Sequence, residues 1–419
     1  MSDGNGAARI AVTGVGMVCP IGIGREATWT AALAGAPGAA PITGFDVSEY
    51  GAQFACEVHD FDPLEFVDRK SARRMDRCSQ LAVAAARLAL QDADLTISDA
   101  DSTRAGAVVA TGNGGNLSYE QQHRTFLERG ADRVSPLTVS LIIGNMAAGH
   151  VSMQIGLRGP LLSVVTACAS SLHAIGEAAE IIRAGEADVM LAGGSEAPVT
   201  PFGLGMLDAS RAMSRRNDAP ERASRPFDRD RDGFVLGEAG AILVLERWDR
   251  AIDRGAPILC EFAAYGATGD AHHVTEPSPD GAQQARAMRI AMAKGGLTPD
   301  DIDHVNAHAT STNVGDAAEV RSIITALGAD RAGGVAVNAT KSMHGHCIAG
   351  TGALESALTA LAIHHGEIPG TINLENLDPE CVGVDHVTAS RKQSIDGALC
   401  SGFGFGGHNA VVALRKARG

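Results

Sequence analysis

Cys168 lies where a run of β-branched residues gives way to a helical pattern. The segment reads Ser163-Val-Val-Thr-Ala-Cys168-Ala-Ser-Ser-Leu-His-Ala-Ile-Gly-Glu, and after Cys168 its apolar residues recur at helical spacing. This pattern predicts a thiol at a helix N-terminus, where unpaired backbone N–H groups and the helix dipole stabilise a thiolate. We therefore expect the pKa of the thiol to fall from about 8.5 toward neutrality or below. A cysteine among alanines and serines is more often a small buried apolar residue, so other residues must support its candidacy as a nucleophile.

Two histidines further along the chain occupy turns that could face such a thiol. His308 belongs to Asn306-Ala-His-Ala-Thr-Ser-Thr-Asn-Val-Gly-Asp, and His346 belongs to Lys341-Ser-Met-His-Gly-His-Cys-Ile-Ala-Gly. Either histidine alone is more often a hydrogen-bonded structural residue. Beside a developing negative charge, however, a neutral imidazole can donate a hydrogen bond without bringing a charge of its own.

The end of the chain contains a segment that is too rich in glycine for a packed strand. Four of the six residues from Gly402 to Gly407 are glycine, in the sequence Gly-Phe-Gly-Phe-Gly-Gly. Such a backbone can approach a substrate closely and present its N–H groups to an oxygen atom, as an oxyanion hole requires.

Alternating helical and strand-like segments must position these residues. Strands are predicted near residues 9–18, 105–110, 162–167, 188–192, 239–245, 258–264, 335–337 and 410–414, and helices near 81–95, 281–294 and 352–364. The alternation indicates an α/β protein. The polar stretch 214–232 is predicted to be an ordered surface loop. A polar seam at residues 249–256 suggests a division into an N-terminal part, 1–255, and a C-terminal part, 256–419.

Composition and charge narrow the function classes. The 419 residues are 45% apolar and 20% charged, which is ordinary for a folded protein, and the net charge of −14 argues against general binding to nucleic acid or anionic membrane. The eight cysteines are widely spaced and form no C-x-x-C motif, which favours a reduced compartment. No signal-peptide pattern opens the sequence and no apolar run is long enough to span a bilayer, so we expect a cytoplasmic protein.

Three motifs that suggest a cofactor or a metal do not hold. The glycines of Val-Thr-Gly-Val-Gly-Met-Val-Cys-Pro-Ile-Gly-Ile-Gly, residues 12–24, lack dinucleotide-binding spacing. The acidic run that begins at Asp228 resembles half a calcium loop, but the twelfth position is Ala239. The cluster of His344, His346 and Cys347 lacks a second ligand pair for zinc. We expect no bound cofactor and no metal.

Four motifs together resemble one enzyme family over essentially the whole chain. The segments Thr-Ala-Cys-Ala-Ser-Ser, His-Ala-Thr-Ser-Thr-x-x-Gly-Asp, Lys-Ser-Met-x-Gly-His and Gly-Phe-Gly-Phe-Gly-Gly occur in this order. They closely resemble the β-ketoacyl-[acyl-carrier-protein] synthase II family, the condensing enzymes of type II fatty acid and polyketide synthesis. The resemblance implies the thiolase fold, in which two pseudo-equivalent halves form a five-layered α-β-α-β-α body that is usually dimeric. Residues 1–255 would carry the cysteine and residues 256–419 the two histidines.

The resemblance also implies a reaction and a role for each motif. An acyl chain would pass from the phosphopantetheine thiol of an acyl carrier protein to Cys168, and malonyl carrier protein would then lose its carboxylate and attack the thioester. His308 and His346 would face the malonyl unit, and the backbone N–H groups of Cys168 and Phe405 would form the oxyanion hole.

Other residues match positions around that centre. Thr310 and Thr312 match hydroxyls that contact the malonyl or pantetheine groups, and Phe403 and Gly404 belong to the substrate-binding loop. Lys341 and Glu319 match a buried ion pair with an orienting role.

A cluster of basic residues matches the family's carrier-docking segment. It consists of Arg69, Lys70, Arg73, Arg74 and Arg77. At helical spacing Arg69, Arg73 and Arg77 share one face, and Arg211 would extend the patch. A solvated helix face would show the same pattern, but on an acidic protein the cluster suits an acidic carrier.

Three positions depart from the fatty-acid members of the family. Asn113 stands where Ile or Val usually lines the acyl pocket, Leu207 stands where an aromatic residue is common, and His344 replaces a threonine. An amide beside a saturated alkyl chain lacks hydrogen-bond partners. We therefore favour a type II polyketide or other specialised pathway, with housekeeping fatty-acid elongation as the alternative. The motif around Cys168 argues against the aromatic polyketide subgroup. The partner would be a second copy or a chain-length-factor subunit.

Other functions remain open at this point. A degradative thiolase would need a second cysteine in the terminal loop, where Phe403 and Phe405 stand, and Cys400 comes too early. A silent partner subunit would not need the cysteine and the two histidines. A cysteine acyl hydrolase of the Cys-His-Asn type could use Asn306, Asn338 or Asn409.

Overall fold

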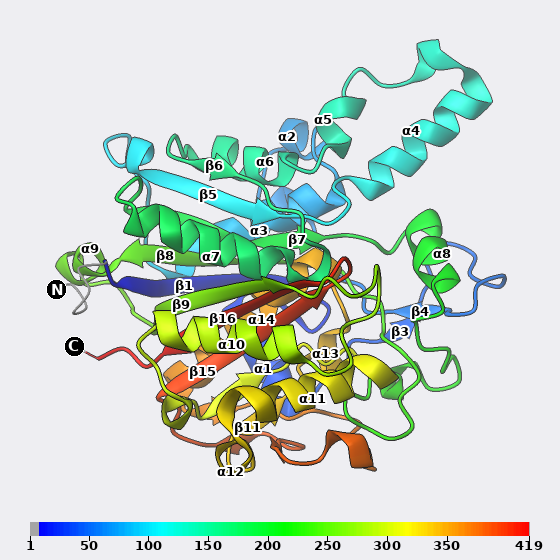
Figure 1. Cartoon of the computed structure of the whole chain (residues 1–419). Coiled ribbons are helices and arrows are strands. Elements are labelled where there is room, and N and C mark those ends of the chain that lie inside the picture. The colour runs from blue at the N-terminus through cyan, green and yellow to red at the C-terminus, as the bar shows by residue number, and fades with distance from the viewer. Residues whose placement is uncertain (1–7, 419) are drawn as a thin grey trace.

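A continuous series of hydrogen-bonded strands crosses the molecule (Figure 1). The structure is a computed structural model and describes residues 8–418. The strand order is β6-β5-β7-β8-β1-β9-β16-β15-β10-β11-β13. These strands are β1 (Ile10–Cys19), β5 (Ala105–Ala110), β6 (Leu161–Leu162), β7 (Val189–Glu196), β8 (Ala239–Arg247), β9 (Cys260–Gly269), β10 (His304–Asn306), β11 (Ala336–Asn338), β13 (Asp385–His386), β15 (Gly397–Gly404) and β16 (His408–Arg415).

The strand order repeats between the two halves of the chain. In the first half β6, β5 and β7 are parallel neighbours, and β8 and β1 follow in antiparallel pairing. In the second half β11, β10 and β15 are parallel neighbours, and β16 and β9 follow in antiparallel pairing. Three residue pairs between β1 and β9 join the halves. The expected pseudo-equivalent halves are confirmed, whereas the boundary at residues 255 and 256 stays a prediction.

Helices cover both faces of each half and produce five layers. The helix α3 (Arg77–Asp92) packs on β1, β7 and β8, and α10 (Ala282–Lys294) packs on β9 and β16, with α11 (Asn313–Leu327) against α10. Between them, α7 (Ser170–Arg183) and α14 (Thr351–His365) pack on each other and on strands of both halves. The helix α14 is buried at every residue from Thr351 to Ile363, and its many alanines and leucines suit a helix that is enclosed on all sides. This is the α-β-α-β-α order that the resemblance implied.

Glycine allows the outer helices to lie close to the sheet at equivalent places in the two halves. A Cβ atom on Gly16 of β1 would lie 1.9 Å from the carbonyl oxygen of Ala85 in α3. A Cβ atom on Gly266 of β9 would lie 2.1 Å from the carbonyl oxygen of Ala287 in α10. The high glycine content therefore serves close packing between helix and strand.

The remaining elements lie around this body. They are α1 (Arg25–Ala34), α2 (Arg69–Ala72), α4 (Asn116–Arg129), α5 (Thr138–Ile142), α6 (Met146–Ile155), α8 (Pro201–Ala209), α9 (Trp248–Asp253), α12 (Ala329–Ala332), α13 (Lys341–His344), β2 (Gly22–Ile23), β3 (Ala40–Pro41), β4 (Phe54–Ala55), β12 (Glu367–Ile368) and β14 (Arg391–Lys392). The helices α4 and α5 form an arm that projects from the body (Figure 1).

Two predictions about local structure are wrong. The strand expected at residues 162–167 is only Leu161–Leu162, after which the chain turns toward Cys168. The basic segment is not one continuous helix, because α2 ends at Ala72 and α3 begins at Arg77. The side chains of Asp68 and Asp76 accept hydrogen bonds from the first backbone N–H groups of α2 and α3, and so each starts its own helix.

The polar stretch 214–232 follows the surface as an irregular segment fixed by buried charge. The side chain of Arg231 is 1% exposed and pairs with Asp378 at 2.6 Å, and Arg225 pairs with Asp228 at 3.0 Å. No helix among residues 8–418 is long and apolar enough to cross a membrane, and all eight cysteines are unpaired.

Candidate active site

The turn that carries Cys168 is tightly constrained. Cys168 lies in a single 3₁₀ turn, Ala167–Ala169, directly before α7. Ala167 has φ of 50°, a left-handed conformation that costs energy for a residue with a Cβ atom. The hydroxyl of Ser170 holds this turn, because it accepts a hydrogen bond from the N–H of Thr166 at 2.8 Å and donates one to the carbonyl of Ala167 at 2.6 Å. The serine of the motif thus fixes the turn that carries the thiol.

Cys168, His308 and His346 meet in space. The Nε2 atom of His346 lies 3.0 Å from the Sγ atom of Cys168, and the sulfur and one nitrogen of each imidazole all lie within 4.8 Å of one another. The two imidazole rings are 5.5 Å apart, centre to centre, and nearly perpendicular. The structure therefore brings together the three residues that the sequence singled out as its candidate nucleophile and imidazole pair.

The ends of parallel strands explain why His308 reaches this place. Asn306, the last residue of β10, pairs in register with Asn338 of β11 and with Cys400 of β15. Beyond this edge of the sheet the chain continues to His308, to α13 and to the glycine-rich loop. The carboxylate of Glu319 fixes the first of these segments by accepting hydrogen bonds from the N–H groups of His308 and Ala309, at 2.8 and 2.7 Å.

His346 is held from both sides. Its backbone N–H donates to the carbonyl of Val235 at 2.7 Å, and its Nδ1 atom lies 3.0 Å from the hydroxyl oxygen of Thr351. A threonine hydroxyl can both donate and accept, so Thr351 suits either neutral tautomer of the ring. The Nε2 atom stays directed at the thiol in both cases.

The predicted ion pair between Lys341 and Glu319 is wrong. The Nζ atom of Lys341 lies 2.7 and 2.8 Å from the two carboxylate oxygens of Glu355, and both side chains are at most 1% exposed. The carboxylate of Glu319 instead holds the turn at His308. Glu355 was missed, although a single charged residue in the otherwise uncharged segment Thr-Gly-Ala-Leu-Glu-Ser-Ala-Leu is a visible signal.

The imidazole rings of His308 and His346 are uncharged at neutral pH. Burial lowers the pKa of His308 well below its usual value, and the charge of Lys341 and the neighbouring His346 lower it further. Burial, Lys341 and His344 do the same for His346. Neutral rings can donate a hydrogen bond to a negative oxygen without carrying charge in the resting site.

The expected low pKa of Cys168 is wrong in direction. Burial raises the pKa of the thiol to about 11, and the opposing effects of Lys341 and of the backbone N–H groups of Phe405 and Cys168 only moderate the rise. Loss of hydration therefore outweighs the position before a helix. The resting form of Cys168 is therefore a thiol. A nucleophilic role for this thiol requires a base for its proton, and His346 lies closest among the charged and imidazole groups described.

The glycine-rich loop brings backbone N–H groups to the sulfur. A Cβ atom on Gly404 would lie 2.6 Å from the carbonyl oxygen of Thr166 and 3.1 Å from the nitrogen of Cys168, so only glycine allows this approach. The N–H of Phe405, the next residue, interacts with the Cys168 sulfur, as does the N–H of Cys168 itself. These are the two donors that the resemblance implied for an oxyanion hole.

A cavity of about 870 Å³ opens onto Cys168. It is lined by each residue that the sequence offered for substrate binding, namely Asn113, Leu207, Thr310, Thr312, Phe403 and Gly404, and also by Arg211. The hydroxyls of Thr310 and Thr312 lie 3.1 Å apart on its wall. His344 lies outside the cavity as a buried side chain between Thr340 and the carbonyl of Gly345.

The basic cluster divides into exposed and anchored residues. Arg69, Lys70, Arg73 and Arg74 are exposed. Arg77 is partly buried, because its guanidinium pairs with Glu238 at 2.7 Å and donates to the carbonyl of Val58, and its part in docking stays a prediction. Arg211 is exposed at the Cys168 cavity.

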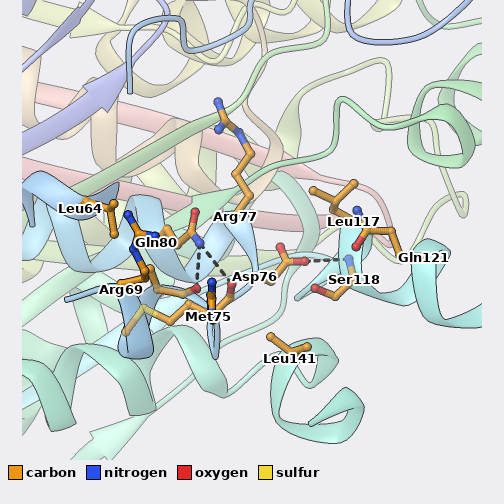
Figure 2. A pocket seen from close by; sticks show the side chains of 12 residues that line it. Leu64, Arg69, Met75, Asp76, Arg77, Gln80, Leu117, Ser118, Gln121 and Leu141 are labelled. Carbon is orange, nitrogen blue, oxygen red and sulfur yellow. Dashed lines mark hydrogen bonds between the residues drawn. The ribbon is translucent and has the colours of Figure 1, made fainter. Parts of the chain in front are cut away.

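A recess of about 450 Å³ lies within the basic cluster (Figure 2). Its walls combine the side chains of Arg69 and Arg73 with apolar groups, among them Leu64 and Leu141. Figure 2 shows Asp76 facing the backbone of Ser118, where its carboxylate accepts a hydrogen bond at 2.8 Å. This hydrogen bond fixes the wall of the recess at Asp76, while the side chains of Arg69 and Arg73 are exposed to solvent.

Comparisons with known proteins match the chain over nearly its whole length. Residues 7–251 match the family model described as the beta-ketoacyl synthase N-terminal domain, and residues 259–375 match the C-terminal domain. The chain is 44% identical over 409 residues to the 3-oxoacyl-[acyl-carrier-protein] synthase 2 of Synechocystis sp., covering 97% of this chain and 98% of that protein. It is 43% identical over 410 residues to the protein of the same name from Vibrio cholerae, covering 97% and 99%.

Solved structures of ketosynthases are also similar to this chain over nearly its whole length. The ishigamide ketosynthase/chain length factor is similar with a TM-score of 0.92 and 33% identity, over 98% of this chain and 100% of that chain. A ketosynthase solved with its type II polyketide acyl-carrier protein is similar with a TM-score of 0.90 and 32% identity, over the same shares.

The high pKa of Cys168 predicts how it reacts with a small alkylating reagent. The rate of alkylation by iodoacetamide should keep rising up to about pH 11, because the thiolate is the reactive form. The rate is measured by mass spectrometry of the Cys168 peptide, with Cys168→Ala as the control. The other seven cysteines are buried and should react far more slowly. A plateau reached below neutral pH would contradict the assignment of a protonated resting thiol.

Proposed function

Because the chain belongs to the β-ketoacyl synthase family and is an acyltransferase of the thiolase fold, we propose that Cys168, His308 and His346 carry out its decarboxylative condensation. The substrates are an acyl chain and a malonyl group, each carried on the phosphopantetheine of an acyl carrier protein. The observation that carries the proposal is the 3.0 Å contact between His346 Nε2 and Cys168 Sγ within the cavity that also holds His308.

In the first half of the reaction the thiol of Cys168 gives its proton to His346 Nε2 and attacks the thioester carbonyl. The N–H groups of Cys168 and Phe405 stabilise the oxyanion, a kind of contact whose loss typically costs about 3–4 kcal/mol of transition-state stabilisation. The carbon–sulfur bond to the carrier breaks, and the proton on His346 passes to the departing pantetheine thiol. The acyl chain then rests on Cys168 in the cavity.

In the second half malonyl carrier protein occupies the cavity and loses CO₂. The electron pair of the broken carbon–carbon bond forms an enolate, whose oxygen accepts hydrogen bonds from the neutral rings of His308 and His346. For this step the ring of His346 exchanges its proton with solvent to the tautomer protonated at Nε2, in which the hydroxyl of Thr351 donates to Nδ1. The enolate carbon attacks the acyl thioester, and Cys168 leaves as a thiolate that recovers a proton. The product is a 3-oxoacyl chain two carbons longer.

The other functions considered lack their own geometry among residues 8–418. The side chains of Asn306, Asn338 and Asn409 bond to other groups and not to the rings of His308 or His346, so a Cys-His-Asn hydrolase set is not formed. Cys400 is fully buried and lies outside the cavity, so it does not supply the second cysteine of a thiolase.

The proposal is tested with an acyl carrier protein and malonyl carrier protein. Incubation with acyl carrier protein alone should give an acyl adduct on Cys168, and adding malonyl carrier protein should release a chain two carbons longer. Cys168→Ala should form no adduct, and His308→Ala should form the adduct but lose condensation by about 10²-fold or more. Release of free fatty acid without extension would favour the hydrolase.

We infer that the carrier docks on the exposed basic cluster of Arg69, Lys70, Arg73 and Arg74, with Arg211 at the cavity. The charges are open to solvent, and the recess beside them offers apolar walls for a side chain of the carrier. A basic surface on a chain of net charge −14 favours an acidic partner at this place.

Charge reversal tests the docking site. Arg73→Glu with Arg74→Glu should raise KM for acyl carrier protein by about tenfold or more while leaving the reaction with a small acyl thioester unchanged, because only the carrier carries the acidic surface. Arg229→Glu with Arg286→Glu, which reverses two exposed charges elsewhere, is the matched control. An equal loss with both substrates would refute the docking role.

The choice between a fatty-acid and a polyketide substrate concerns the part of the cavity that is lined by Asn113, Leu207 and Met206. We propose a polyketide or other specialised substrate with polar or unsaturated groups, because the amide of Asn113 has no hydrogen-bond partner among the described side chains and could bond to such a group. Both fatty-acid and polyketide enzymes occur among the similar proteins.

Asn113→Ile tests this preference. The variant should accept long saturated acyl chains better, by about fivefold or more in kcat/KM, because an alkyl chain then meets an apolar wall. Its activity with an oxygenated chain of the same length should fall. If the parent enzyme already prefers saturated chains and Asn113→Ile changes nothing, the fatty-acid alternative stands.

We further propose that the enzyme acts in the cytoplasm and pairs with a second subunit of the same fold, either a copy of itself or a chain-length factor. The arm and the adjoining sheet edge expose large apolar side chains, among them Leu127 (68%), Val139 (65%), Met153 (62%) and Leu162 (48%). An apolar surface of this kind beside an open edge strand favours coverage by another chain. Eight unpaired cysteines suit a reducing compartment.

A further inference from the structure

Glu196 is a fully buried carboxylate near the nucleophile that no step above employs. It is the last residue of β7, it is 0% exposed, and it forms no ion pair with any residue in the described range. A buried carboxylate without a counter-charge is costly, so its retention calls for strong hydrogen bonds.

Three backbone donors surround this carboxylate. Its Oε2 atom accepts from the N–H of Gly112 at 2.5 Å, its Oε1 atom accepts from the N–H of Asn113 at 3.1 Å, and the N–H of Ala349 also donates to it. Gly112 and Asn113 form the turn after β5. Ala349 lies in the turn before α14, next to Ile348. One side chain therefore connects two turns that are more than 200 residues apart in the sequence.

Both turns line the cavity at Cys168. Gly112, Asn113 and Ile348 belong to its wall. Ile348 has φ of 45°, a strained conformation that the surroundings must hold in place. A Cβ atom on Gly112 would lie 2.6 Å from Glu196 Oε2, so the first turn approaches the carboxylate as closely as a residue without a side chain allows.

We propose that Glu196 is a positioning residue that sets acyl-chain preference by holding the turns of Asn113 and Ile348 side by side in the cavity wall. This inference rests on the proposed function, because it assigns the cavity to an acyl chain. Burial raises the pKa of Glu196 to about 7, so the carboxylate is ionised above neutral pH. In that form it is an acceptor at both oxygens and can satisfy all three N–H groups. An amide at the same place would turn an NH₂ donor toward at least one of them.

The central variant is Glu196→Gln, which keeps the shape and removes an acceptor. We measure the rate at which Cys168 takes up short, medium and long acyl groups from small thioesters, using mass spectrometry of the intact protein. The ratio of the long-chain rate to the short-chain rate should change by about tenfold, because a buried hydrogen bond to a charged group is lost from the cavity wall. This readout needs no condensation, so it is separate from the test of the proposed function.

A second variant approaches the same contact from the other side. Gly112→Ala places a methyl group against Glu196 Oε2, and it should alter the chain ratio in the same direction as Glu196→Gln. The matched control is Glu246→Gln, since Glu246 is also 0% exposed but pairs with Arg250 and Arg254 away from the cavity. That control should lower thermal stability and leave the chain ratio unchanged.

A further readout separates positioning from general loss of structure. The negative charge of Glu196 raises the pKa of the Cys168 thiol, so Glu196→Gln should move the alkylation profile of Cys168 to lower pH. Unchanged chain ratios in both Glu196→Gln and Gly112→Ala would overturn the proposal, as would an equal change in Glu246→Gln. Altered ratios in an enzyme that fails to condense would leave the positioning role standing and refute the proposed function.

Discussion

The site depends on keeping its reactive groups uncharged in a buried environment. Among the described residues, Lys341 is the cation that lowers the pKa of Cys168, of His308 and of His346. Its charge is balanced by Glu355 at 2.7 Å. Burial then keeps Cys168 protonated and both rings neutral. In the proposed reaction charge develops only transiently, and the oxygen that becomes negative accepts hydrogen bonds from two backbone N–H groups or from two imidazoles. Burial of this kind makes each transient charge interact strongly with fixed donors.

The two halves contribute equivalent positions with different chemistry. In each half a strained residue begins a 3₁₀ turn that leads into a central helix: Ala167, with φ of 50°, comes before α7, and Ile348, with φ of 45°, comes before α14. In the first half this place carries the nucleophile. In the second half it follows His346 and forms part of the cavity wall. A duplicated backbone has therefore become one site in which each copy supplies a different component.

The sequence predicts the reactive groups better than their electrostatics. Cys168, His308 and His346 stand in long motifs, and the ends of parallel strands bring such motifs together, so their meeting could be expected. The pKa of Cys168 could not, because the helix position is visible locally whereas burial depends on the whole fold. The partner of Lys341 was also mistaken, since two glutamates were available and only the packing of α14 shows that Glu355 is the closer one.

In the basic segment the local helix boundary differs from the one that the spacing predicts. Helical spacing predicts Arg77 beside Arg69 and Arg73, whereas Asp76 is itself a helix-start signal in the sequence. That aspartate ends the expected helix and redirects Arg77 toward Glu238. The repeat of strand order between the halves becomes visible only in the pairing of the strands, since Gly16 of β1 and Gly266 of β9 occupy equivalent places without any sequence repeat to mark them.

The common core has a thermodynamic consequence. Side chains from β1, α7, α14 and β16, including Ile10, Leu172, Leu358 and Leu414, form one continuous apolar cluster. Neither half can open without exposing the apolar surface of the other, so melting is expected to be a single cooperative event. A molecule bound at Cys168 would then add its binding free energy to the stability of the entire chain, including strands that it never touches.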